Sequence, residues 1–463
     1  MIEGMTRRGQ HAVVLGASMA GLLTARVLTE FYDHVSLIER DELDDSAAPR
    51  RGVPQSRQPH LLLARCGLIL EELFPGITAD LVAGGAHEWR DGDLSRFHAH
   101  FGGHLLARDG RIPDPGSVVN YFASRAFLES HVRRRVLALP TLTLMDRHDI
   151  DSLVCRGCAV TGVRVTSRAD RATRDIDADL VVDATGRGSR TPAFLEQMGY
   201  PRPREDHLAV NVCYVSMPVR IPDGALHEYL IVDLFKPGKP RGFAMLRCEN
   251  DTWIAAIGTL GKDVEAPASA AELMAFAEPL MPPHVFAAIK AGEPLDDVAL
   301  HRFPANRWRR YDRMVRFPAH LLVTGDAVCS FNPIYGQGMT VAAVEVMTLR
   351  GCLRRSGTDL PRRFHRAAAK TVAVAWRTAV GSDLSLPEVE GPRTLSARLS
   401  NGYVDRVLRA AETDPWVAQQ FFQVTGMLSP PAVLFRPAML RRLAGAATRR
   451  PDTVRPVDVG ATA

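Results

Sequence analysis

The sequence predicts an α/β fold in which a parallel sheet is joined to an inserted antiparallel sheet and a helical C-terminal region. Three observations predict this organisation. Short apolar runs lead into glycine-containing turns at three places, around residues 16, 186 and 325. Between residues 208 and 313, apolar and polar residues alternate with the period of antiparallel strands. From about residue 349 onward, the apolar residues recur with helical spacing.

The first glycine turn lies within a complete strand–helix–strand unit. The apolar run 11–15 is typical of a buried parallel strand, and "GASMAG" follows it from Gly16 to Gly21. Gly16 permits a tight turn, Gly21 lets the next helix pack closely, and the start of that helix offers free N–H groups to a pyrophosphate. Glu39 ends the second strand, where it can accept hydrogen bonds from ribose hydroxyls, although Ser18 replaces the usual middle glycine. The unit predicts a Rossmann-like dinucleotide site, with a purely structural βαβ unit as the alternative.

The second glycine turn follows a short buried strand. Residues 180–182 run into Asp183 and Gly186, and the residues before them alternate as a β-meander would. A meander that returns to the sheet before such a turn is typical of large FAD-binding domains. An ordinary glycine turn after a strand is the alternative, but it would not explain a third turn of this kind at Gly325.

The third turn opens the segment "GDAVCSFNPIYGQGM", which starts at Gly325 and leads into a long apolar helix. Asp326 stands at a strand end, where it can hold a ribityl hydroxyl or reach phosphate through water. The helix begins near Gly338, so its positive end would stabilise a flavin ring that has gained an electron pair. The segment therefore predicts the flavin end of an FAD site. The expected environment of the ring comprises Pro333, Gly336, Gln337 and Gly338.

Five segments together resemble one enzyme family. These are "GASMAGL", "ER" at the second strand end, "SRAFLESHVRRRV", "DATGRGS" and "GDAVCSFNPIYGQGM". They resemble class A flavoprotein monooxygenases, and most closely the squalene-epoxidase-like and bacterial polyether flavin epoxidase branch, from about Val13 to Val346. The resemblance implies an FAD-binding domain at residues 1–207 and 314–348, an antiparallel β substrate domain at 208–313, and a C-terminal helical region at 349–463.

The resemblance also implies roles for individual residues. Arg51 and Arg125 would lie along FAD, although Arg50 could replace Arg51 because the gap after the second strand varies in length. Met19, Ala20, Glu39 and Arg40 would contact the adenosine half, and Asp326 and Met339 the ribityl chain and ring. With the turn residues, the predicted FAD contacts are Gly16, Ser18, Met19, Ala20, Gly21, Glu39, Arg40, Arg51, Arg125, Asp183, Gly186, Gly325, Asp326, Pro333, Gly336, Gly338 and Met339. No catalytic side chain is predicted, because the flavin performs the chemistry, and no metal site is expected.

The implied activity is that of an FAD-dependent monooxygenase that uses O2 through a flavin hydroperoxide. We expect it to epoxidise alkenes of an apolar polyketide or terpenoid natural product. An aromatic (phenolic) hydroxylase is the alternative, with His60 or His104 as a candidate base. A geranylgeranyl-reductase-like alkene reductase and a non-catalytic flavin carrier are further alternatives. A tryptophan-halogenase-type enzyme needs a lysine, but none precedes Lys236, and Trp253 lacks the second Trp of the halogenase motif.

The residues of the second turn do not decide how the flavin would be reduced. The family's aromatic hydroxylases have an Asp where this chain has Thr185, and an Arg where it has Pro192, whereas Ser189 matches. Reduction by NAD(P)H, either directly or through a separate flavin reductase partner, is therefore expected.

Composition excludes other classes of function. The net charge is +5, but only five residues are lysine, so the arginine bias indicates codon usage more than a nucleic-acid surface. Cys155 and Cys158 fall in a predicted hairpin turn, which favours a reduced cytoplasmic protein. No uninterrupted apolar run of about 20 residues predicts a transmembrane span.

Overall fold

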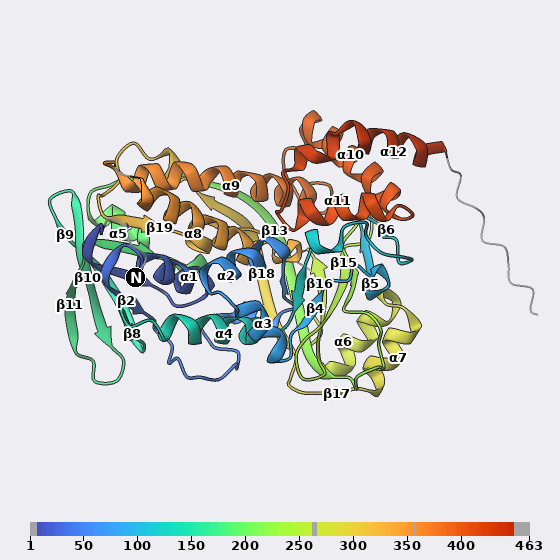
Figure 1. The fold of residues 1–463 in the computed structure, drawn as a ribbon, viewed down its shortest axis with the longest axis horizontal. Coiled ribbons are helices and arrows are strands. Elements are labelled where there is room, and N and C mark those ends of the chain that lie inside the picture. Colours follow the sequence, from blue (N-terminus) through green and yellow to red (C-terminus); the bar gives the residue numbers. More distant parts are fainter. Residues whose placement is uncertain (1–6, 262–265, 356, 449–463) are drawn as a thin grey trace, which may run out of the picture.

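The computed structural model describes residues 7–261, 266–355 and 357–448, and it confirms the predicted α/β fold (Figure 1). Its central sheet has five parallel strands in the order β19-β12-β1-β2-β8. These strands are β1 (Gly9–Leu15), β2 (Tyr32–Ile38), β8 (Leu142–Met145), β12 (Leu180–Asp183) and β19 (Leu321–Val323). The strands before all three predicted glycine turns thus end at one edge of the sheet. Residues 449–463 of the predicted helical region lie outside the described residues.

Both faces of the parallel sheet are covered, which explains why its strands are continuous apolar runs. Val14 packs in a cluster with helices α1 (Met19–Leu28), α4 (Arg125–Leu137) and α8 (Gly338–Arg354). Val13 points to the opposite face and packs with a three-stranded meander. The meander consists of β9 (His148–Arg156), β10 (Ala159–Ser167) and β11 (Thr173–Asp177). Cys155 and Cys158 lie at the turn from β9 to β10, as predicted, and both are free and exposed.

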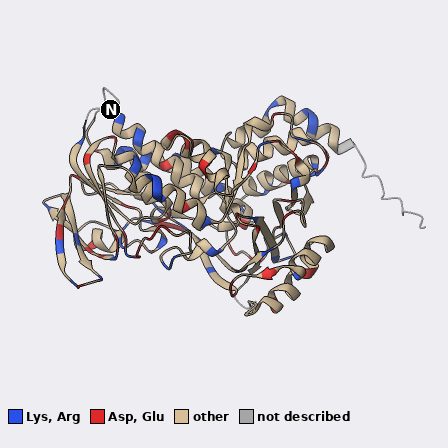
Figure 2. Cartoon of the chain, turned by 60° about the horizontal axis from the view of Figure 1, so that its bottom comes forward, with Lys and Arg blue, Asp and Glu red and all other residues tan. Residues whose placement is uncertain are grey.

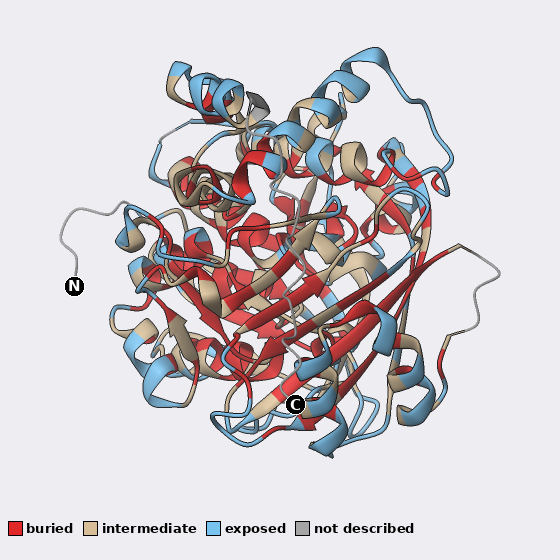
Figure 3. Cartoon of the chain, turned by 90° about the vertical axis from the view of Figure 1, so that its right-hand side faces the viewer, coloured by how far each residue is buried: buried red, intermediate tan, exposed pale blue. Residues whose placement is uncertain are grey.

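The second sheet has nine strands in the order β20-β18-β13-β16-β15-β14-β5-β6, with β17 beside β13. Its strands are β5 (Phe97–Phe101), β6 (His104–Leu105), β13 (Glu205–Arg220), β14 (Leu230–Asp233), β15 (Arg241–Arg247), β16 (Thr252–Leu260), β17 (Glu293–Pro294), β18 (Ala299–Arg309) and β20 (Cys329–Ser330). β5, β6 and β20 come from outside the expected range 208–313, and β5 pairs with β14 in parallel. Helices α6 (Ala270–Ala277) and α7 (Pro283–Ala291) cover one face, and the long strands are largely buried (Figure 3).

The C-terminal helices divide into two groups. Helix α9 (Leu360–Asp383) packs beside α8 along the parallel sheet. Helices α10 (Leu395–Ala411), α11 (Pro415–Thr425) and α12 (Pro437–Thr448) instead lie over the β5–β6 end of the second sheet (Figure 1). Val407 and Val417 there share a buried cluster with Trp89 and Phe97. The last helices thus cover the β5–β6 end of the second sheet.

Smaller elements join the two sheets. Strands β3 (Leu61–Leu62), β4 (His87–Trp89) and β7 (Asn120–Phe122) form a short sheet. Helices α2 (Ala64–Leu73), α3 (Ile77–Ala83) and α5 (Thr191–Gln197) complete the described fold. Basic and acidic residues are intermixed over the described elements (Figure 2). None of the described helices combines the length and apolar character needed to cross a bilayer.

Candidate active site

One cavity of about 1410 Å³ extends from the parallel sheet to the second sheet. Its lining includes the turns that follow β1, β12 and β19, and then strands β14, β15 and β16. The carboxyl ends of parallel strands form the usual ligand crevice of such folds, because the turns there are free to vary. The three predicted turns therefore meet at a single site.

Most of the predicted site residues line this cavity. Those that do are Gly16, Ser18, Met19, Ala20, Glu39, Arg40, Arg125, Asp183, Gly186, Asp326, Pro333, Gly336, Gln337, Gly338 and Met339. Gly21, Arg51 and Gly325 are outside the lining. Gly21 and Gly325 are buried directly behind it, whereas Arg51 is exposed.

The first turn depends on two glycines at close backbone contacts. Gly16 has a φ of +93°, and a Cβ there would lie 2.7 Å from the carbonyl oxygen of Ala184. A Cβ on Gly21 would lie 1.7 Å from the carbonyl oxygen of Gly16. Ser18 precedes α1 but makes no capping bond, because its hydroxyl accepts from Arg125 (2.9 Å) and donates to Glu129 (3.1 Å). The first N–H groups of α1 thus have no side-chain cap and can bind an anion.

A buried charge network stands behind the first turn. Arg50 is 3.2 Å from Glu39 and 2.7 Å from Glu129, and it also donates to the carbonyl of Ala17. Arg125 approaches Glu129 at 2.9 Å from one turn earlier in α4. Burial alone would raise the pKa of Glu129, but Arg125 and Arg50 outweigh it and hold the pKa below its usual range.

Arg50, and not Arg51, therefore occupies the position along the cavity in this structure. The sequence alone could not separate these neighbours. The carboxylate of Glu39 accepts a hydrogen bond from the N–H of Ala17 at 2.8 Å, so it connects the end of β2 to the first turn. Glu129 was not predicted, although its spacing of four from Arg125 on a helix was a usable signal.

We expect Arg50→Ala to lose most of the bound cofactor. The change removes the ion pair of Glu39 and leaves Glu129 with Arg125 alone. Removing one member of a buried ion pair costs about 3–5 kcal/mol of folding free energy. Arg51→Ala is the matched control, because Arg51 is exposed and outside the cavity. Flavin absorbance per protein after gel filtration measures how much cofactor each variant retains. Equal retention by the two variants would contradict the placement of Arg50.

The second turn is held by Asp183. Its carboxylate accepts from the backbone N–H (2.8 Å) and hydroxyl (2.6 Å) of Thr185 and from the hydroxyls of Ser189 and Thr191. Because so many donors already surround Asp183, it shapes the turn and has little capacity for a ligand. Thr185 and Ser189, which the family comparison singled out, contribute by fixing that carboxylate.

The third turn presents Asp326 to the cavity. Asp326 is exposed and lines the cavity. Desolvation by the protein around it raises the pKa of Asp326. The positive charges of Arg187 and Arg125 lower this pKa but do not cancel the rise. Behind it, the N–H of Gly325 donates to Glu345 at 2.8 Å, so a side chain of α8 holds the turn in place. Glu345 was not predicted, because it lies within an apolar helix.

Glu345 should make stability depend on pH. Burial raises its pKa from 4.5 to about 8, with a smaller contribution from Asp326, and bonds from Gly325 and Thr324 oppose the rise. The folded protein therefore binds a proton that the unfolded chain releases, so stability falls as pH rises from 4.5 to about 8, by up to about 1.4 kcal/mol per pH unit. We expect Glu345→Gln, measured by thermal melting across this range, to remove that slope. An unchanged slope relative to wild type would rule out Glu345 as its source.

The loop after the third turn is fixed from a distance. Asp383, at the end of α9, accepts from Asn332 (3.0 Å), Tyr335 (2.7 Å) and Asn306 (2.6 Å). Gln337 donates to the carbonyl of Thr425 in α11 at 2.9 Å. The loop expected to surround the flavin ring is thus bound to both groups of C-terminal helices. No sequence signal pointed to Asp383.

The far part of the cavity is apolar. Its walls come from the second sheet and from α10 and α11, and they include Phe97, Leu230, Phe243, Leu246, Ile257, Phe303, Val407, Leu408, Phe421 and Phe422. The expectation of an apolar substrate chamber agrees with this lining. The helices that close it were not expected to contribute.

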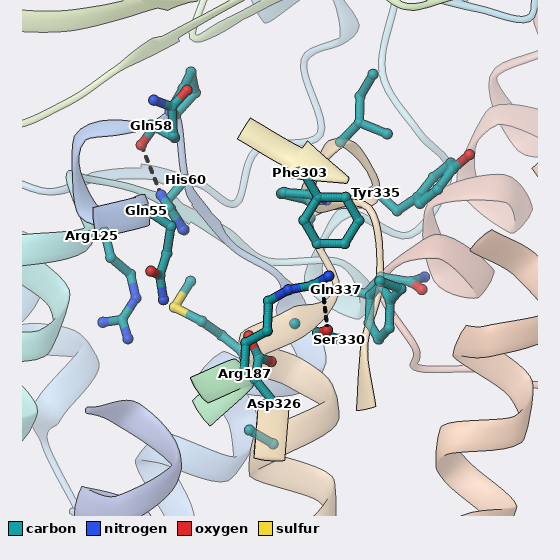
Figure 4. A pocket seen from close by; sticks show the side chains of 18 of the residues that line it. Gln55, Gln58, His60, Arg125, Arg187, Phe303, Asp326, Ser330, Tyr335 and Gln337 are labelled. Atoms are coloured by element: carbon teal, nitrogen blue, oxygen red, sulfur yellow. Dashed lines mark hydrogen bonds between the residues drawn. The ribbon is translucent and has the colours of Figure 1, made fainter. Parts of the chain in front are cut away.

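The two candidate histidines differ in position. His60 lines the cavity, and its Nδ1 lies 2.8 Å from the carbonyl oxygen of Gln58 (Figure 4). Because a carbonyl only accepts, Nδ1 carries the proton and Nε2 keeps its lone pair. Burial, with Arg125 nearby, lowers the pKa of His60 to about 4, so the ring is neutral. His104 is outside the lining and bridges Asp405 and Glu412.

Comparisons with known proteins place these features in a family. No family model matches the sequence. Protein Rv3254 of Mycobacterium tuberculosis is 38% identical over 429 residues, which cover 90% of each chain. A kynurenine 3-monooxygenase of Salinispora tropica is 26% identical, covering 94% of this chain and 92% of its own.

Among solved structures, the flavin-dependent brominase Bmp2 has the same fold. It superposes with a TM-score of 0.64 at 13% identity and covers 95% of this chain and 99% of its own. The identity and coverage with Protein Rv3254, together with this fold, decide the assignment. The chain belongs to the family of Protein Rv3254 and has the fold of the flavin-dependent brominase.

Proposed function

We propose that this chain is an FAD-dependent monooxygenase that transfers one oxygen atom of O2 to a large apolar substrate. One observation carries the proposal: a single cavity joins the three glycine turns to an apolar chamber. Its volume of about 1410 Å³ exceeds the roughly 300–1000 Å³ of ordinary ligand pockets, as expected for a cofactor and a substrate together. When bound, FAD supplies O2 activation, and the apolar walls exclude water from the reacting atoms.

The lining offers side chains and N–H groups of suitable chemistry for each part of FAD. The uncapped start of α1 suits the diphosphate, because it offers N–H groups and a positive dipole end. Glu39 accepts from the N–H groups of Ala17, Arg40 and Asp41 and pairs with Arg50, so it shapes the adenosine end of the proposed site from behind. Asp326 suits the ribityl chain. The loop from Pro333 to Gly338 suits the ring, since α8 begins there without a side-chain cap. These residues, with Arg50 in place of Arg51, form the proposed FAD site.

Epoxidation of an alkene is the favoured reaction, because it needs no base. His60 lies in the cavity, but a pKa of about 4 makes it a weak acceptor for a phenol proton. Similarity to squalene-epoxidase-like enzymes in the motifs supports the same reaction. Hydroxylation of an aromatic ring is the second candidate, supported by the kynurenine 3-monooxygenase relative.

Halogenation is not proposed, although the brominase shares the fold. Within the described residues, no lysine lines the cavity. Trp253, the residue closest to a halogenase motif, is buried in the core beneath the second sheet. Similarity at 13% identity concerns the fold and does not extend to this chemistry.

Product analysis with the holoenzyme tests the proposal. Purified enzyme, first checked for release of FAD rather than FMN on denaturation, receives trans-stilbene or 2-naphthol. NADH or NADPH is supplied with and without a separate flavin reductase. An epoxide supports the favoured reaction, a dihydroxynaphthalene supports hydroxylation, and dibenzyl would establish alkene reduction instead. Dependence on the added reductase decides whether NAD(P)H acts directly.

A further inference from the structure

The second turn places the guanidinium of Arg187 in the cavity, where it forms no ion pair with a described carboxylate. Arg187 is half-buried and lines the cavity at the junction of the proposed FAD site and the second sheet. Within the described part of the chain, no carboxylate lies within 4.0 Å of its guanidinium. Burial and the neighbouring Arg307 both lower the pKa of Arg187, and Asp326 and Glu205 oppose them only through longer-range attraction. The charge is thus incompletely compensated.

Other arginines of the lining are different. Arg50 pairs with Glu39 and Glu129, and Arg125 pairs with Glu129. Arg40, Arg190 and Arg302 are exposed, and Arg190 also donates to the carbonyl of Ile150. Among the arginines of the lining, Arg187 is therefore the one that is half-buried and has no carboxylate as an ion-pair partner within the described residues.

Arg187 is also held rigidly. Its Nη1 donates to the Ser330 hydroxyl at 2.6 Å, and its guanidinium carbon lies 4.7 Å from the centroid of the Phe303 ring. Its carbonyl oxygen accepts from both Arg307 and Arg309. Figure 4 shows the side chain between Asp326 and Phe303, reaching Ser330. A guanidinium so oriented, with N–H donors to spare, is prepared to bind an oxyanion.

We propose that Arg187 is a specificity residue that binds an acidic oxygen of the substrate, such as a carboxylate, phenolate or enolate. The inference rests on the proposed function and narrows its substrate class to apolar acids. In an apolar chamber, a lone cation attracts such a group strongly because water does not screen it. Phe303, which Arg187 covers, belongs to the second sheet, so the anion would lie on the substrate side of the cavity.

Binding to oxidised holoenzyme tests the proposal without turnover. The probes are 2-naphthoate and 2-naphthamide, which share their shape and differ in charge, and calorimetry gives the two dissociation constants. Wild type should prefer naphthoate by about 10- to 100-fold, the usual effect of a charge-assisted bond. Arg187→Gln should reduce the preference to near 1, and Arg187→Lys should keep part of it. Arg190→Gln is the control and should keep all of it.

Two outcomes would overturn the inference. One is an unchanged preference in Arg187→Gln. The other is loss of FAD from that variant with the preference intact in the remaining holoenzyme, which would assign Arg187 to the cofactor. If Arg187→Gln does not fold, a preference in Arg187→Lys below that of Arg190→Gln still supports the role, and equality refutes it. Because no oxygen transfer is measured, these results are independent of whether the chain is a monooxygenase.

Discussion

Gly16→Val is expected to abolish FAD binding. Gly16 has a φ of +93°, which a β-branched residue does not adopt, and its new Cβ would lie 2.7 Å from the Ala184 carbonyl oxygen. Both the first and second turns would have to move apart, because the obstacle is backbone on each side. The start of α1 would then leave the cavity. Flavin absorbance per protein after gel filtration should fall to background.

A matched glycine separates this effect from general damage. Gly188 lines the same cavity, has no positive φ, and a Cβ there would meet nothing within 4 Å. Gly188→Ala should therefore retain FAD at the wild-type level. Stoichiometric FAD in Gly16→Val would show that the first turn is not needed for the cofactor.

Gly336→Val should retain some FAD but lose turnover by a factor of 100 or more, as an order of magnitude for a misplaced reacting group. Gly336 has a φ of +66° and lies in the loop that we assign to the flavin ring. Nothing lies within 4 Å of a Cβ built there, so the side chain would enter the cavity itself. Product formation per bound FAD is the measurement.

Gly336→Asn distinguishes backbone strain at a positive φ from a side chain that occupies the space of the flavin ring. Asn tolerates positive φ far better than Val but has a similar size. If the ring occupies this space, both variants lose turnover. A fully active Asn variant would mean that only the backbone conformation matters, and that the ring lies elsewhere.

The local parts of the site could be predicted from sequence. A strand, a glycine turn and a helix are consecutive in the chain, so Gly16 and Asp326 could be identified from apolar runs and turn residues. The contacts that fix these turns are long-range. Glu129 meets Arg50 across 79 residues, and Asp383 meets Asn306 across 77. No local pattern specifies such pairs, which is why Arg50 and Arg51 could not be separated.

The substrate end was harder to predict for the same reason. Alternation predicted antiparallel strands between residues 208 and 313, but β5 joins that sheet from residues 97–101. The docking of α10 and α11 over it depends on side chains such as Val407 and Phe422, whose partners lie about 300 residues away. Helical periodicity indicates which face is buried, but not against what it packs.

In the proposed reaction, one oxygen atom of O2 enters the substrate. Turnover under ¹⁸O2 in unlabelled water, with mass spectrometry of product and solvent, tests it most directly. We expect one ¹⁸O atom in the product and the other in water. A saturated product without label would contradict it and establish an alkene reductase.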